Sequence, residues 1–150
     1  MNGIEHKESI KMFTPVSIRA SNSYKTVDIE SSVLGASPHQ LVGLMFTKLL
    51  QSFSSARVAM QNRDVPNKVR SIGLSLRILE EGLKGGLDTK RGGELASNLA
   101  NLYDYCILRT TEANLRNDVR MIDEVVGLIQ PLAEGWGEIR GESAVQAYQS

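Results

Sequence analysis

Residues 101–118 read NLYDYCILRTTEANLRND, and the folding of this stretch decides the architecture of the chain. It contains neither glycine nor proline, so nothing in it interrupts a helix. The helix is predicted to run from about Glu94 to Arg116, because apolar side chains recur every three or four residues along one face. The core-facing seam predicted for it consists of Leu95, Leu99, Leu102, Cys106, Arg109 and Ala113.

Three further helices are predicted from the same periodicity. The first begins after Ser37, where SPHQ forms a capping box with proline at the first helical position, and it ends near Gln61. The second follows Asp64 and ends before a Gly-Gly pair, and the fourth follows Asn117 and should kink at Pro131. Their apolar seams are Val42, Met45, Phe46, Leu49, Phe53, Ala56 and Met60; then Val65, Val69, Ile72, Leu76, Leu79 and Leu83; and then Ile122, Val125, Ile129, Leu132, Trp136 and Ile139.

Four amphipathic helices with short connections predict an all-α fold, an antiparallel up-down four-helix bundle. The bundle domain is assigned to residues 23–140, between a flexible N-terminal lead at 1–22 and a flexible tail at 141–150. A short segment with Tyr24 and Val27 is expected to pack on the bundle.

Composition argues against several classes of function. Lys plus Arg equals Asp plus Glu at 17 each, and the cations are scattered singly, which disfavours a nucleic-acid partner. No apolar run approaches the roughly 20 residues of a membrane span, so membrane insertion is not expected. No targeting signal is recognised, which favours a cytoplasmic location. The single cysteine, Cys106, lies on an apolar seam and is predicted to be a buried hydrophobe rather than a reactive thiol.

No constellation of side chains suggests catalysis. The two histidines are His6, in the lead, and His39, which is expected to face solvent in the first turn of its helix. The paired Glu-x-x-His motifs of bundle metal sites are missing, as are a phosphate-binding loop and a nucleophile elbow. Adjacent acids such as Asp123 and Glu124 are interpreted as solvated faces. We therefore expect no enzymatic activity, metal or cofactor.

The third helix carries more apolar surface than one bundle face requires. Tyr103 and Ile107 lie beside its predicted seam, and Leu108 and Leu115 lie nearly opposite it. One interpretation is an irregular bundle whose extra faces the N-terminal segment covers, and another is a groove that accepts a helix from another chain. Both can hold if the segment covers the groove until a client displaces it. A third hypothesis is a structural or adaptor bundle that buries the surplus by self-association.

Three stretches resemble the flagellar secretion chaperone family: IESSVLGASPHQL, GLKGGLDTKRGGELASNLANLYDYCILRTTEANLRND and EVVGLIQPLAEGW. The likeness runs in unbroken order from about Tyr24 to Ile139. It implies a non-enzymatic bacterial cytoplasmic protein whose partner is the C-terminal region of flagellin, disordered when free and helical when bound. It also implies contact with the type III export apparatus, and assembly regulators are further candidate partners.

The candidate site residues combine this resemblance with the helical wheel. Tyr24 and Val27 match the family's N-terminal segment, which is expected to plug or contact the client site. The wheel adds Tyr103 and Ile107 as groove residues, and Leu108 and Leu115 as a second client-contacting stripe. Bracing roles are predicted for Arg109, which can pair with Glu112, and for Asn114, Asn117 and Asp118 at the following turn.

Overall fold

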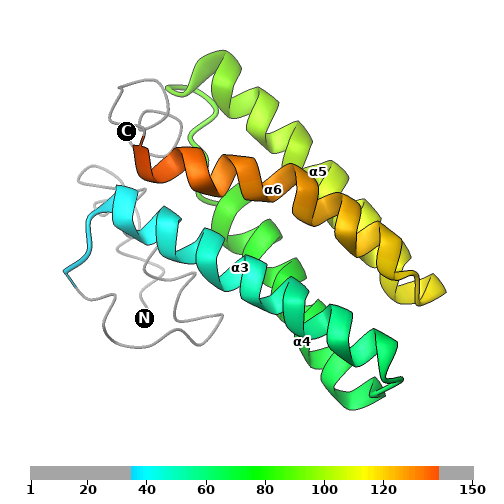
Figure 1. The fold of residues 1–150 in the computed structure, drawn as a ribbon. Helices are drawn as coiled ribbons and strands as arrows, with labels where there is room; N and C mark the ends of the chain where they lie inside the picture. The colour runs from blue at the N-terminus through cyan, green and yellow to red at the C-terminus, as the bar shows by residue number, and fades with distance from the viewer. Residues whose placement is uncertain (1–34, 139–150) are drawn as a thin grey trace, which may run out of the picture.

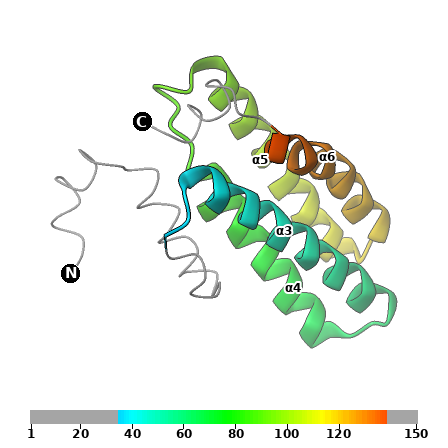
Figure 2. The same ribbon diagram turned by 60° about the vertical axis from the view of Figure 1, so that its left-hand side comes forward.

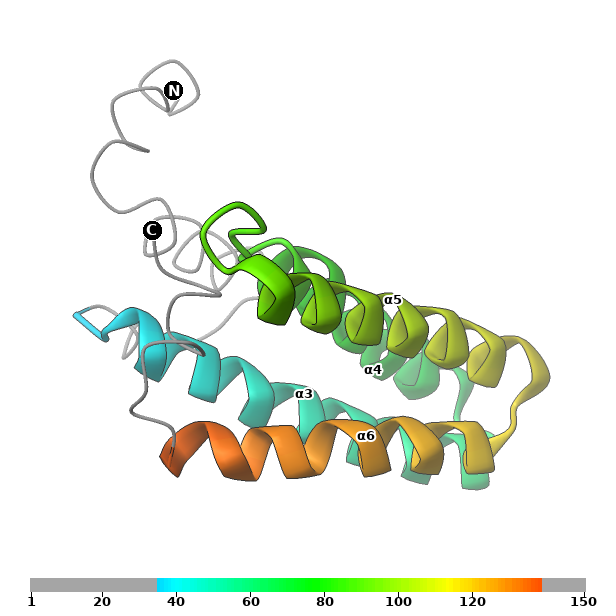
Figure 3. The same cartoon turned by 90° about the horizontal axis from the view of Figure 1, so that it is seen from above.

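The computed structural model describes residues 35–138, and these form four antiparallel helices (Figures 1 and 2). Helix α3 spans Pro38–Gln61, α4 spans Val65–Arg77, α5 spans Gly93–Arg116 and α6 spans Val119–Glu138. A π-helix, η2, continues α4 over Ile78–Lys84. Each helix packs on two neighbours, so that α3 and α6 form one layer and α4 with α5 the other (Figure 3). The predicted all-α bundle is confirmed; Tyr24, Val27, the lead and the tail lie outside the described residues.

Helix α3 begins and packs as its sequence predicts. The Ser37 hydroxyl accepts a hydrogen bond from the Gln40 amide, and the Gln40 side chain accepts one from the Ser37 amide, which completes the capping box. All seven residues of its predicted seam are buried. This helix therefore supplies the largest continuous share of the core.

The second predicted helix differs from expectation at both ends. Val65 and Val69 were assigned to its seam, but they are 60% and 59% exposed. Ile72, Leu79 and Leu83 of the predicted seam are buried as expected, and α4 and η2 also bury Ser75 and Ile78. The wider π turn changes the register of the helix, which brings the neighbours Ile78 and Leu79 both into the core.

The seam of α5 is rotated relative to the prediction. Its buried residues are Ala96, Leu99, Tyr103, Cys106, Thr110 and Ala113, which also follow alternating spacings of three and four. Compared with the predicted seam, Ala96 replaces Leu95, Tyr103 replaces Leu102 and Thr110 replaces Arg109. The centre of the buried face turns by roughly 50° at 100° per residue. The rotation takes the Arg109 guanidinium away from the core, where Thr110 replaces it, and buries the Tyr103 ring about one and a half to two turns earlier.

Ionic contacts hold the first half of α6 to both of its neighbours. The Arg57 guanidinium of α3 donates to both carboxylate oxygens of Asp123, at 2.8 and 3.1 Å. On the opposite edge of α6, Glu124 accepts hydrogen bonds from the Tyr105 hydroxyl and from Arg109 Nε of α5, the latter at 2.8 Å. The adjacent acids, interpreted from sequence as solvated, therefore bind two different helices.

Reciprocal contacts hold the second half of α6. The Trp136 indole N–H donates to the His39 carbonyl at 2.9 Å, and His39 Nε2 lies 2.9 Å from the Trp136 carbonyl. The two rings stack with centroids 4.9 Å apart. His39 is thus partly buried, not solvent-facing as predicted, because the end of α6 covers it. Helix α6 continues through Pro131, and both Pro131 and the Gly127 carbonyl that loses its partner lie on the exposed side.

One buried polar atom in the described core has no hydrogen-bond partner: the Thr110 hydroxyl. A buried hydroxyl without a partner costs about 1–3 kcal/mol, so Thr110→Val should raise the free energy of unfolding by about 1 kcal/mol. Urea denaturation would measure the difference. The matched control is Thr111→Val, on the exposed side of the same helix, which should change stability little. Equal effects of the two substitutions would contradict this assignment.

Acid should weaken the contacts of α6. The hydrogen bonds from Arg57 lower the pKa of Asp123, and those from Tyr105 and Arg109 lower the pKa of Glu124. Carboxyls with a lower pKa in the folded state stabilise the protein above their ordinary pKa of about 4, and this stabilisation is lost as the pH falls through the folded pKa. The D123N/E124Q double variant should therefore have a lower Tm than the wild-type protein at neutral pH, and the two Tm values should converge in acid. Glu94→Gln, at an exposed carboxylate with no ion pair among the described residues, is the control, and a gap that persists unchanged in acid would contradict the prediction.

Candidate interaction surface

The structure separates the four residues of α5 that were predicted to bind a client. Tyr103 is fully buried in the core, so its placement on an open groove was wrong, because the rotated seam includes it. Ile107 is half-buried and packs against the core from the edge of the helix. Leu108 and Leu115 are 57% and 83% exposed. Only the last two present large apolar surface to solvent.

Leu108 and Leu115 belong to one line along the outside of α5. Asp104, Leu108, Thr111 and Leu115 follow one another at spacings of four, three and four, which places them on one helical face. We call these four residues the α5 outer line. Asp104, the first residue of the line, shows which neighbouring helix the line faces, because its carboxylate pairs with Lys84 of η2 at 2.7 Å. The line therefore lies toward the α4 and η2 side of α5, away from α6.

The neighbouring helix adds exposed aliphatic side chains that sequence analysis assigned to the core. Val65 and Val69 lie one turn apart near the start of α4, which packs on α5. On a helical wheel they share the edge of Leu76, on the opposite side of the helix from Asn67, Ser71 and Leu74, which line the groove toward α3. The bundle is antiparallel, so the start of α4 lies alongside the end of α5, where Leu115 is. A signal in the sequence existed: proline at position 66 and the position of Val65 at a helix start both favour exposure.

Polar side chains define the other edge of α5. Arg109 pairs with Glu124 of α6 at 2.8 Å and with Glu112 at 2.9 Å, and the hydrogen bond to Glu124 raises its pKa further. The Arg109–Glu112 pair is the one expected from their spacing. The Tyr105 hydroxyl also donates a hydrogen bond to Glu124. This network fixes α5 against α6 and involves no residue of the outer line.

The turn after α5 is held by the residues assigned to bracing. Asn117 ends the helix in the left-handed conformation, with φ of 52°, and its amide contacts the Asn114 carbonyl. Its side-chain amide donates to the Met60 carbonyl at 3.4 Å, which joins this turn to the end of α3. Asp118, rather than Asn117, caps α6, because its carboxylate accepts from the Arg120 amide at 3.0 Å.

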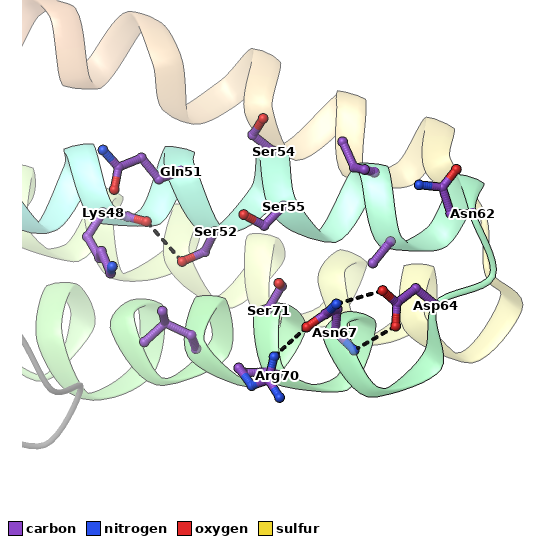
Figure 4. Close-up of a pocket in the computed structure, with 13 residues that line it drawn as sticks. Lys48, Gln51, Ser52, Ser54, Ser55, Asn62, Asp64, Asn67, Arg70 and Ser71 are labelled. Atoms are coloured by element: carbon purple, nitrogen blue, oxygen red, sulfur yellow. Dashed lines mark hydrogen bonds between the residues drawn. The ribbon is translucent and has the colours of Figure 1, made fainter.

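Two grooves elsewhere on the bundle offer different chemistry. One, of about 580 Å³, runs between α3 and α4 and is lined by serine, asparagine and glutamine side chains with Lys48 and Arg70 (Figure 4). Its buried Ser52 hydroxyl already donates to the Lys48 carbonyl. The other, of about 750 Å³, lies between the start of α3 and the end of α6, next to the stacked His39 and Trp136. Neither groove combines exposed large aliphatic side chains from two helices.

The described residues contain no cluster of three His, Cys, Asp or Glu side chains that could hold a metal ion. Cys106 is buried as predicted, and burial raises the pKa of its thiol to about 12, which leaves no thiolate at neutral pH. In residues 35–138, no helix has the length and apolar character of a membrane span.

Comparison with known proteins identifies the family to which this chain belongs. The family model of the flagellar protein FliS matches residues 20–143. The flagellar secretion chaperone FliS of Salmonella typhimurium is 42% identical over 135 residues, which cover 90% of this chain and 98% of that protein. Flagellar secretion chaperone FliSB of Pseudomonas aeruginosa is 41% identical over 122 residues, covering 81% and 96%, and FliS of Escherichia coli is 36% identical over 120 residues, covering 80% and 88%. The chain belongs to the FliS family of flagellar secretion chaperones.

Proposed function

We propose that this protein binds the C-terminal region of flagellin in the bacterial cytoplasm, prevents its premature polymerisation and keeps it competent for type III flagellar secretion. The names of its relatives support the export role, since they are called flagellar secretion chaperones. The family resemblance found in the sequence suggests the client segment. The observation that carries the proposal is the exposure of Leu108 and Leu115 on one line of α5.

The physical basis is the burial of apolar area that the bundle leaves in water. Fully burying a leucine side chain contributes about 1.5–3 kcal/mol, and Val65 and Val69 can add to this. A helix laid along α5 would meet the outer line at i, i+4, i+7 and i+11, the spacing at which two helices interlock. A client that is disordered when free loses part of this gain on folding, about 2–5 kcal/mol or more.

The remaining partners follow from the same proposal. Docking at the type III export apparatus would bring the loaded chaperone to the secretion channel, and assembly regulators remain candidate partners. Ile107 would line the inner edge of the client site, where it is half-buried. Tyr24 and Val27 would plug or contact the site in the manner implied by the resemblance. The proposed role requires no catalysis and no cofactor.

Self-association is the second candidate, because the same exposed leucines could pair two copies of the chain. Sedimentation distinguishes the two. A tight homodimer that ignores flagellin would favour an adaptor, whereas a monomer that forms a stoichiometric complex with a flagellin fragment would favour the chaperone.

The double variant L108Q/L115Q should bind a C-terminal flagellin fragment more weakly, with Kd raised at least about tenfold, because two apolar contacts are lost. Glutamine keeps the helix propensity, so the fold should remain intact. Isothermal titration calorimetry gives Kd, and circular dichroism shows whether the fragment gains helix on mixing.

The control for this experiment is Leu44→Gln. Leu44 is also exposed, but it lies on α3, which packs on α4 and α6 in the other layer of the bundle. This substitution should leave Kd within about twofold, as expected for a side chain outside the interface. Unchanged binding by L108Q/L115Q would remove the outer line from the client site, and no binding by the native chain would refute the proposed function.

A further inference from the structure

The two turns of the bundle meet at one end, and their charges are not balanced. The α3–α4 and α5–α6 connections adjoin there, joined by the hydrogen bond from Asn117 to Met60 (Figure 1). Residues 61–69 and 114–121 contain four cations, Arg63, Lys68, Arg116 and Arg120, and two carboxylates, Asp64 and Asp118. We call this end of the bundle the cationic tip.

Both carboxylates of the tip are occupied within it. Asp64 accepts hydrogen bonds from the backbone amide and side chain of Asn67, and Asp118 accepts them from Arg120. Arg63, Lys68 and Arg116 form no ion pair among the described residues. The charge that remains free at the tip is therefore positive.

The opposite end of the described bundle has the reverse balance. Residues 35–43, 85–96 and 130–138 carry four acids, Asp88, Glu94, Glu134 and Glu138, against Lys90 and Arg91. Since the net charge of the chain is zero, this asymmetry does not appear in its composition. It gives the described bundle a positive and a negative end along its axis.

The backbone adds a second observation at the tip. Arg63 has φ of 54°, in the left-handed region where glycine or asparagine would be less strained. An arginine there is disfavoured by the turn itself and gains no intramolecular ion pair. Strained positions of this kind recur at functional sites, which points to a use for the side chain outside the protomer.

The tip is continuous with the surface proposed to bind the client. Leu115, the last member of the α5 outer line, lies in the last turn of α5 at the end of the bundle that carries these cations, and the exposed Val65 follows Arg63 by two residues. A helix lying along the outer line and continuing past Leu115 would reach this end of the bundle. Charge complementarity therefore selects a client segment that carries carboxylates at the end reaching the tip.

We propose that the cationic tip binds an acidic stretch of the client and so fixes the direction in which the client lies along α5. This inference rests on the proposed function. The spacings of the α5 outer line, four, three and four, are the same in either direction, so the spacing alone does not fix the direction of the client. The tip breaks that symmetry: it attracts the acidic end of the client and leaves the other end near the acidic pole of the bundle.

The test compares two double variants that each remove two positive charges. R63Q/R116Q alters the tip, and K90Q/R91Q alters exposed cations at the other end of the bundle. At low NaCl concentration, the tip variant should raise Kd for a flagellin C-terminal fragment about three- to tenfold, mainly through slower association. The difference should shrink at high salt, and the control should bind like wild type at both. Thermal melting would show that both variants remain folded.

A second measurement locates the acidic stretch. In a series of fragments with individual Asp or Glu residues changed to amides, one group of positions should lose most of the sensitivity to R63Q/R116Q, as coupled partners do in a double-mutant cycle. Equal Kd and equal salt dependence for the two double variants would overturn the inference, and if L108Q/L115Q still weakened binding, the proposed function would survive. If the native chain did not bind the fragment, both the inference about the cationic tip and the proposed function would be refuted.

Discussion

The rotation of α5 about its own axis determines what the rest of the molecule can present. Six positions at alternating spacings, from Ala96 to Ala113, are buried against the other helices, with Tyr103 and Thr110 among them. Once these residues face inward, Leu108 and Leu115 must face outward, because they lie on the opposite side of the same helix. A bundle of this size could have placed polar residues there at no cost to its core. The exposed leucines are therefore a property of the surface, and the proposed function depends on them.

The surroundings of α5 keep this surface in place. Glu124 and Asp123 connect α6 to α5 on one side and to α3 on the other, and the stacked His39 and Trp136 join the far end of α6 to the start of α3. At the turns, Asn117 reaches the Met60 carbonyl. Exposed ion pairs contribute little individually, but together these contacts connect neighbouring helices at three levels of the bundle. The outer line thus lies on a helix that is held by its neighbours on both sides, so most of the ordering cost of binding would fall on the partner.

Periodicity and capping were sufficient to predict the bundle, the start of α3 and seven of the ten residues that α3 buries. They failed on α5 because two seams fit its sequence equally well in spacing. The prediction followed the leucines at positions 95 and 102, whereas the structure buries Tyr103 and Thr110 and half-exposes both leucines. The choice between the two seams depends on the shape of the neighbouring helices, which the pattern of one helix does not contain. The π turn at Ile78–Lys84 was not predicted either, because the periodicity argument assumes a regular α-helix. Within this turn Gly82 approaches Met45 so closely that a Cβ would lie 2.5 Å from the sulfur. Within the candidate site, the exposure of Leu108 and Leu115 was predicted correctly, whereas Tyr103 was predicted to be accessible and is buried. The charge asymmetry of the tip could not be predicted without knowing which turns lie at the same end of the bundle.

Cysteine labelling would show whether a bound flagellin fragment covers the α5 outer line. The native Cys106 is buried with a raised thiol pKa, so L108C and L115C each introduce the single reactive thiol among the described residues. Alkylation rates would be measured with and without a saturating C-terminal flagellin fragment, with L44C as a reference on α3. We expect the alkylation of L108C and L115C to be much slower in the complex than in the free protein, and the rate for L44C to be unchanged. Equal alkylation of L108C and L115C in the free and saturated protein would contradict it.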